Sequence, residues 1–185
     1  GTGGDTPRLI DVAREEARAE IEAHLARIRP HDFQHVIAAL LQGMGYAKAI
    51  VSPPGADGGT DILAFKDTLG REVPHLRVQV KHRADASGRE EIAALRGILR
   101  PEREIGLFVA TGGFTKEARR EAEGASHIRL IDLDDVLALW IAHAATIPEH
   151  ARNWLKLTPV HFLDVSGGLR RCAPNPTAPN SDSPR

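Results

Sequence analysis

Cysteine is nearly absent from this sequence, because Cys172 is the only one among 185 residues. A single thiol excludes an internal disulfide framework, so the fold depends on a packed core, and a reducing cytoplasm is the expected location. No apolar run approaches the ~18–20 residues of a membrane-spanning helix, and no signal peptide is visible. These absences predict a cytoplasmic protein without a membrane partner, and its length suffices for one domain with a proper core.

A strong net charge is also lacking, since the formal charge is −1 at pH 7. The overall charge therefore gives no reason to expect a nucleic-acid partner. The distribution is uneven, however, because residues 77–120 contain more Lys and Arg than Asp and Glu, which leaves the remainder acidic. A basic patch on one face of an otherwise acidic protein is typical of a surface that binds a polyanion.

The pattern of apolar residues predicts an α/β fold that follows an N-terminal helical arm. Residues 6–29 repeat apolar side chains at helical spacing, and Pro30 ends that helix because proline cannot continue it. Alternating strands and helices from Ile105 onward indicate parallel strand pairing. The expected elements are helices at 6–29 and 30–43, strands at 47–52, 60–65 and 75–81, a helix opening at 87–90, a strand at 105–110, a helix at 115–123, a strand at 127–131 and a helix after 132–134.

The chain divides into four parts: a helical arm at 1–29, a main domain at 30–147, a closing segment at 148–165 and a tail at 166–185. The closing segment includes a short expected strand at 160–163. The tail holds four of the twelve prolines and has no periodic apolar face, so we expect it to be disordered.

Two local patterns add detail to this plan. Ser87-Gly-Arg-Glu90 has the spacing of a capping box, in which side chains satisfy free N–H groups at the start of a helix. The large aromatic residues Trp140, Trp154 and Tyr46 are expected in the core.

The stretch at 57–81 carries the residues with chemical potential. Asp61 enters one strand, and Gln79 and Lys81 end the next. Residues two apart in a strand share a face, so Gln79 and Lys81 point together while Val80 points into the core. The spacing therefore brings a carboxylate, an amide oxygen and an ammonium group to one place.

Hydrolysis of a phosphodiester needs a nucleophilic water and neutralisation of charge on the phosphate, and a divalent metal held by oxygen ligands supplies both. Asp61 is the candidate carboxylate ligand, Gln79 offers its amide oxygen, and the Val80 backbone carbonyl adds a third oxygen. Lys81 would hold the attacking water and stabilise charge on the phosphate. The same residue types also occur on solvated strand edges, so spacing alone leaves both interpretations open.

Six stretches, in one order and spanning about residues 30–145, resemble the catalytic domain of Mrr-type restriction endonucleases, a branch of the PD-(D/E)XK nuclease superfamily. The matching stretches are Asp32-Phe33-Gln34, Leu40-Leu41-x-x-Met44-Gly45-Tyr46, Asp57-Gly-Gly-Thr-Asp61-Ile62, Val78-Gln79-Val80-Lys81, Gly106-Leu-Phe-Val-Ala-Thr-Gly-Gly-Phe-Thr115 followed by Ala118, and Leu130-Ile131-Asp132.

This resemblance implies a restriction-endonuclease-like mixed β-sheet flanked by helices. It also implies cleavage of double-stranded DNA with Mg²⁺, or with Mn²⁺ in its place, and a role in restricting foreign DNA, modified and phage DNA included. A cut in both strands requires two active sites, so a homodimer or a larger defence complex is expected.

The resemblance also assigns roles to individual residues. It places Asp61 as the metal ligand, Gln79 at a position that is acidic or Gln in the family, and Lys81 as the catalytic lysine. Gln34 occupies a position that is often Glu and assists the metal site, so this chain is expected to hold a metal weakly without DNA. Asp57 is either a second carboxylate of the site or a turn former before two glycines.

Seven residues are candidate DNA contacts, either by positive charge or by a place next to a helix N-terminus, where free backbone N–H groups bind anions. Any of the five basic residues could instead be a solvated helix residue, and for Thr115 a helix N-cap is the favoured role. The seven are Arg83, Arg89, Thr111, Thr115, Lys116, Arg119 and Arg120.

Three other interpretations stay open. His31 and His35 imitate the His-Glu-x-x-His motif of zinc proteases, although the acid is Asp32 and no third ligand follows at a recognisable spacing. A nuclease-like fold retained for DNA binding or assembly is compatible with Gln34. A Holliday-junction nuclease, or another structure-specific nuclease, would use the same residues.

Overall fold

The computed structural model describes residues 5–55 and 59–158. Within these ranges, no helix combines the length and the apolar composition that a membrane crossing requires. The elements in chain order are α1 (Asp5–Leu25), α2 (Pro30–Gly43), β1 (Lys48–Val51), β2 (Ile62–Phe65), β3 (His75–Lys81), α3 (Arg89–Ile98), β4 (Glu104–Ala110), α4 (Lys116–Glu123), β5 (Ile128–Asp132), α5 (Leu133–His143) and α6 (Glu149–Arg152).

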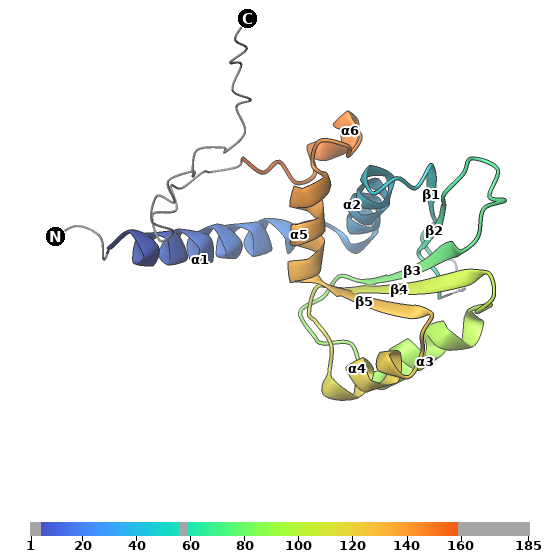
Figure 1. Ribbon diagram of the computed structural model, residues 1–185. Helices are drawn as coiled ribbons and strands as arrows, with labels where there is room; N and C mark the ends of the chain where they lie inside the picture. The colour runs from blue at the N-terminus through green and yellow to red at the C-terminus, as the bar shows by residue number, and fades with distance from the viewer. Residues whose placement is uncertain (1–4, 56–58, 159–185) are drawn as a thin grey trace, which may run out of the picture.

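The five strands form one sheet in the order β1-β2-β3-β4-β5 (Figure 1). The first three strands pair antiparallel, whereas β3, β4 and β5 run parallel to one another. The predicted mixed sheet is therefore confirmed. Antiparallel neighbours need only a short turn, while the parallel strands are joined through helices, as parallel pairing requires.

Helices cover both faces of the sheet (Figure 1). On one face, α2 and α5 pack on the larger core, which contains Phe33, Val78 and Trp140. On the other face, α3 and α4 enclose a second core that contains Leu95 and Phe108. Burial alternates along β3, so one of its faces belongs to the α2 layer and the other faces the α3 layer.

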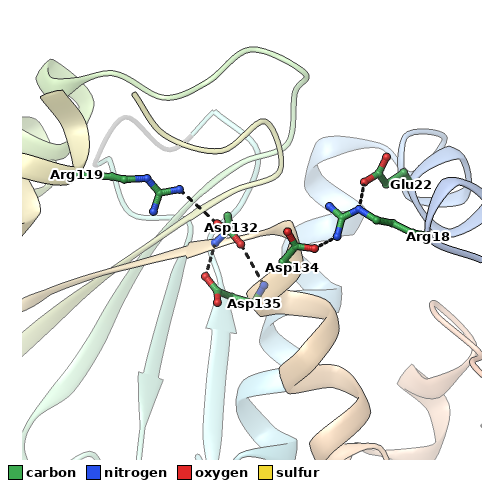
Figure 2. Close-up of polar contacts among 6 residues, drawn as sticks. All are labelled: Arg18, Glu22, Arg119, Asp132, Asp134 and Asp135. Atoms are coloured by element: carbon green, nitrogen blue, oxygen red, sulfur yellow. Dashed lines mark hydrogen bonds and ion pairs between the residues drawn. The ribbon is translucent and has the colours of Figure 1, made fainter. Parts of the chain in front are cut away.

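The helical arm α1 meets the body at its C-terminal end. Leu25 is 2% exposed, whereas Leu9 near the other end is 65% exposed. Arg18 forms ion pairs with Glu22 on the same helix and with Asp134 at the start of α5 (Figure 2). The arm is thus joined to α5 by one exposed ion pair in addition to its buried end.

Two helix boundaries differ from the sequence-based expectation. α1 ends at Leu25 rather than at residue 29, and Pro30 instead occupies the first turn of α2, where its missing N–H is not needed. α3 begins at Arg89, so the acid that accepts the N-cap N–H is Glu91 and not Glu90. Ser87 cannot cap the helix because it is fully buried in a bridge with Phe114.

The aromatic expectations are met in part. Trp140 is 2% exposed and Tyr46 is half-buried against the larger core. Trp154 is 36% exposed, so its assignment to the core is wrong. The expected strand at 160–163 and the tail at 166–185 lie outside the described residues.

Candidate active site

Asp61 is the residue just before β2, the strand that lies between β1 and β3 in the sheet. Its N–H donates to the Val78 carbonyl at 2.8 Å, and its own carbonyl accepts the Ser52 N–H at 2.8 Å. The backbone is therefore held on both sides by the neighbouring strands, which fixes where the carboxylate leaves the chain.

The Asp61 carboxylate is itself held by two donors. Gln34 Nε2 on α2 donates to Oδ1 at 2.8 Å, and the Val80 backbone N–H donates to Oδ2 at 2.7 Å. A carboxylate oxygen has more than one lone pair, so both oxygens keep capacity for a further ligand. The carboxylate is oriented before any ligand arrives, in the way that outer hydrogen bonds orient metal ligands.

The Val80 backbone contributes a second polar group at this place. In a β-strand, the N–H and the C=O of one residue point to the same edge. Because the Val80 N–H points to the Asp61 carboxylate, the Val80 carbonyl also lies on that edge. The candidate third oxygen ligand is thus on the same side of β3 as the candidate carboxylate.

Gln79 and Lys81 lie on the face of β3 expected from the two-residue spacing. Both are half-buried, whereas Val78 and Val80 on the opposite face are 0% and 7% exposed. Gln79 and Lys81 therefore share one face at the end of β3, where the Asp61 carboxylate accepts the Val80 N–H.

The sequence did not indicate Glu91 as part of this site. Its Oε1 is 3.9 Å from Lys81 Nζ, and its Oε2 forms an ion pair with Arg83 at 2.8 Å. Burial alone would raise the pKa of Glu91, but the Gly88 N–H, Arg83 and Lys81 outweigh it and lower the pKa below its usual value. The only sequence signal was the capping-box spacing, which points to the neighbouring acid.

A cavity of about 210 Å³ opens beside the Asp61 carboxylate. Its lining includes His31 and Gln34 from α2 and Ser52, which directly follows β1. The rings of His31 and His35 meet edge to face, with centroids 5.1 Å apart. In the described part of the chain, no three His, Cys, Asp or Glu side chains group as a metal site, so nothing there supports the zinc-protease interpretation.

Three of the candidate DNA contacts are basic residues paired with acids, and Arg83 and Arg89 are two of them. Arg83 pairs with Glu91, and Arg89 pairs with Glu121 at 2.9 Å. The hydrogen bond from Arg89 is the main cause that lowers the pKa of Glu121. Both guanidinium groups are at least partly exposed, so a phosphate can reach them, although each already has a carboxylate partner.

The threonines of the 111–115 segment have structural partners. Thr111 Oγ1 accepts the Arg83 N–H at 3.1 Å, and the Thr111 N–H donates to the Lys81 carbonyl at 3.0 Å. Thr115 caps α4 by accepting the Ala118 N–H at 3.1 Å. The segment therefore ties down the chain that follows β3.

The remaining candidate DNA contacts lie on α4. Lys116 and Arg120 are exposed. Arg119 is 3.5 Å from Asp132, whose carboxylate also caps α5 (Figure 2). Asp57 lies outside the described residues.

Gly112 is expected to be required for the contacts by which the 111–115 segment holds the chain after β3 in place. A Cβ at Gly112 would collide with the backbone carbonyls of Ala84 and Asp85. Because backbone cannot give way as a side chain does, Gly112→Ala should lower the free energy of unfolding by ~1–3 kcal/mol, measured by chemical denaturation.

The matched control is Gly97→Ala on α3, where an added Cβ meets nothing within 4 Å. Alanine is the better helix former, so this variant should gain ~0.5–1 kcal/mol. Equal stability of the two variants would contradict the role given to Gly112.

The donors at this site suit a hard divalent cation. The Asp61 carboxylate, the Gln79 amide and the Val80 carbonyl all offer oxygen atoms, which Mg²⁺ prefers over nitrogen and sulfur. With Asp61 as the one carboxylate among these three groups, much of a Mg²⁺ coordination shell would be left to water and to substrate phosphate.

Comparisons with known proteins show that this chain is similar to restriction enzymes. The type IV methyl-directed restriction enzyme EcoKMrr of Escherichia coli (strain K12) is 27% identical over 160 residues, covering 84% of this chain and 52% of that enzyme. The chain therefore spans about half the length of this curated relative.

Two solved structures share the fold. The MspJI restriction endonuclease, in complex with a 27-mer oligonucleotide, matches with a TM-score of 0.50 and 17% identity over 83% of this chain and 34% of that chain. The DNA modification-dependent restriction endonuclease AspBHI matches with a TM-score of 0.55 and 20% identity over 74% of this chain and 38% of that chain. At these identities the likeness establishes the fold alone.

The sequence profile of the Mrr catalytic domain, described as restriction endonuclease, matches residues 25–140. This match covers more than half of the chain and includes α2 and the whole sheet. The resemblance found in the six separate stretches is thereby confirmed, and the chain belongs to the Mrr-type restriction endonuclease family.

Proposed function

We propose that this chain is the catalytic part of a metal-dependent endonuclease that cleaves double-stranded DNA and restricts foreign DNA in the cytoplasm. The observation that carries the proposal is the fixed Asp61 carboxylate, held by Gln34 and by the Val80 N–H at the end of β3 that also presents Lys81. Such an arrangement suits phosphodiester hydrolysis, because a metal held by Asp61 and the Lys81 ammonium could both act on one phosphate.

Each residue has a defined task in this proposal. Asp61, Gln79 and the Val80 carbonyl would hold Mg²⁺ or Mn²⁺, which supplies activation of water and neutralisation of phosphate charge. Gln34 and the Val80 N–H keep the Asp61 carboxylate oriented. The Lys81 ammonium stabilises the negative charge that builds on the phosphate oxygens.

Cleavage of plasmid DNA tests the reaction. The purified protein with Mg²⁺ should convert supercoiled plasmid to nicked and linear forms, because the cation held by Asp61 would neutralise the phosphate and activate water. EDTA should abolish the conversion, and excess Mg²⁺ should restore it. Absence of cleavage with both Mg²⁺ and Mn²⁺, on every DNA tested, would refute the proposal.

Modified DNA is the proposed substrate class, since EcoKMrr is methyl-directed and AspBHI is modification-dependent. Methylated plasmid, or DNA from a phage with modified bases, should be cut faster than unmodified plasmid of the same sequence. The initial rates on these DNAs and on a four-way junction, compared on gels, check this. Faster cleavage of the junction would favour a structure-specific nuclease instead.

The second candidate function is a nuclease fold that binds DNA or assembles with partners without cutting. Gln34 favours it, because an amide stands where a carboxylate would strengthen the metal site. Metal-dependent DNA binding without any cleavage would support this candidate. A homodimer or a larger defence complex remains the proposed assembly, because a double-strand cut needs two sites.

A further inference from the structure

One acidic side chain on α3 contacts the residues that end and follow β3. Glu91 Oε1 lies 3.9 Å from Lys81 Nζ, and Glu91 Oε2 lies 2.8 Å from the Arg83 guanidinium. The Lys81 side chain is 33% exposed and that of Glu91 27%. The three charges thus form a cluster at the surface, where a DNA phosphate can reach the two cations.

The two oxygens of Glu91 have different partners. Oε2 accepts the Gly88 N–H at 3.1 Å as well as a hydrogen bond from Arg83, so the carboxylate is anchored through this oxygen. Oε1 faces Lys81 at a distance too long for a hydrogen bond but within the range of ion-pair attraction. The Lys81 ammonium is therefore attracted to the vicinity of Glu91 Oε1, while its three N–H donors remain available to water and phosphate.

The main chain around Lys81 is held independently of Glu91. The Lys81 carbonyl accepts the Thr111 N–H at 3.0 Å, and Thr111 Oγ1 accepts the Arg83 N–H at 3.1 Å. The His82 ring stacks on Phe33 of α2, with ring centroids 4.3 Å apart. These contacts leave the long Lys81 side chain free to move. A flexible lysine that must be ordered during the reaction lowers the reaction rate.

We propose that Glu91 is a positioning residue that orients the Lys81 ammonium toward the scissile phosphate before DNA binds. The proposal rests on the nuclease function proposed above. It gives Glu91 two opposite effects: its charge orders Lys81 for the reaction, and the same charge cancels part of the positive potential that DNA phosphates meet. A residue with a merely structural role would not show this opposition.

Replacing Glu91 by glutamine separates the two effects. The amide introduced by Glu91→Gln keeps an oxygen that can accept the Gly88 N–H, so the start of α3 is preserved. The single-turnover cleavage rate with Mg²⁺ should fall about 10-fold, because Lys81 is no longer held in place. The affinity for the same DNA, measured in Ca²⁺ without cleavage, should rise roughly 2–5-fold, because two cations are released from their acid.

Two further variants serve as controls. Glu90→Gln removes the same charge from the adjacent, exposed position, which forms no ion pair within the described residues, and its cleavage rate should equal that of the wild type. Glu91→Asp keeps the charge and should recover most of the rate lost in Glu91→Gln. In a Lys81→Ala background, the gain in DNA affinity from Glu91→Gln should shrink, because one of the two released cations is missing.

The outcomes separate this proposal from the nuclease function. A wild type that cleaves DNA and a Glu91→Gln variant with the same rate would overturn the proposal alone. A parallel loss of rate, DNA affinity and Tm in both Glu91→Gln and Glu91→Asp would also overturn it, in favour of a structural role. A wild type that cuts no DNA would overturn the nuclease function and this proposal together.

Discussion

Asp61→Asn is expected to reduce DNA cleavage about 10³-fold or more and to leave the fold intact. Asparagine has the same shape and keeps one oxygen, which can still accept the Val80 N–H that now reaches Oδ2 at 2.7 Å. The lost charge, however, is the one carboxylate among the proposed metal ligands. Single-turnover rates on plasmid DNA with Mg²⁺, together with the Tm in EDTA, measure the two effects separately.

Asp67→Asn is the matched control for this loss. Asp67 lies in the turn between β2 and β3, where its carboxylate accepts the backbone N–H groups of Leu69, Arg71 and Glu72. This variant removes the same charge from the same hairpin and should cleave DNA at the wild-type rate. Lys81→Ala should lower the rate on the same substrate. Cleavage that survives both Asp61→Asn and Lys81→Ala would mean that the reaction occurs elsewhere.

The strands around the site could be predicted because their patterns are local. The strand expected at 75–81 coincides with β3, since alternating apolar and polar residues fix both its length and its faces. The helix expected at 30–43 coincides with α2, because a proline suits its first turn and Gly43 and Gly45 bracket its end. Asp61 just before β2 and Lys81 at the end of β3 flank the same hairpin for the same reason, and the Asp61 carboxylate accepts the N–H of Val80, the neighbour of Lys81.

What could not be predicted depends on contacts between distant elements. The contact of Glu91 with Lys81 arises from the way α3 returns over the sheet, and no local spacing encodes that distance. The cap of α3 is displaced by one residue because Ser87 is buried in a bridge to Phe114, a partner more than twenty residues away. The hydrogen bond from Gln34 to Asp61 likewise joins α2 to the residue just before β2, and the family pattern indicates only that the two positions belong to one site.

Gln34→Glu is expected to lower the Mg²⁺ concentration for half-maximal cleavage by about 10-fold or more. The amide nitrogen of Gln34 now donates to Asp61 Oδ1 at 2.8 Å. A glutamate there brings a second carboxylate to the site, which strengthens the binding of a divalent cation. Without a cation the two carboxylates repel each other, so the Tm of the variant in EDTA should fall below that of the wild type and should rise more steeply with Mg²⁺.

Gln42→Glu adds the same charge about two turns further along α2 and should change neither the Mg²⁺ requirement nor the response of the Tm to Mg²⁺. An unchanged Mg²⁺ requirement in Gln34→Glu would show that this position does not assist the metal.

The pair of variants also decides between the two candidate functions. If the wild type binds DNA without cutting it and Gln34→Glu cuts, the missing carboxylate alone accounts for an attenuated nuclease. If neither cuts, the fold serves DNA binding or assembly, and the fixed Asp61 carboxylate has no catalytic task.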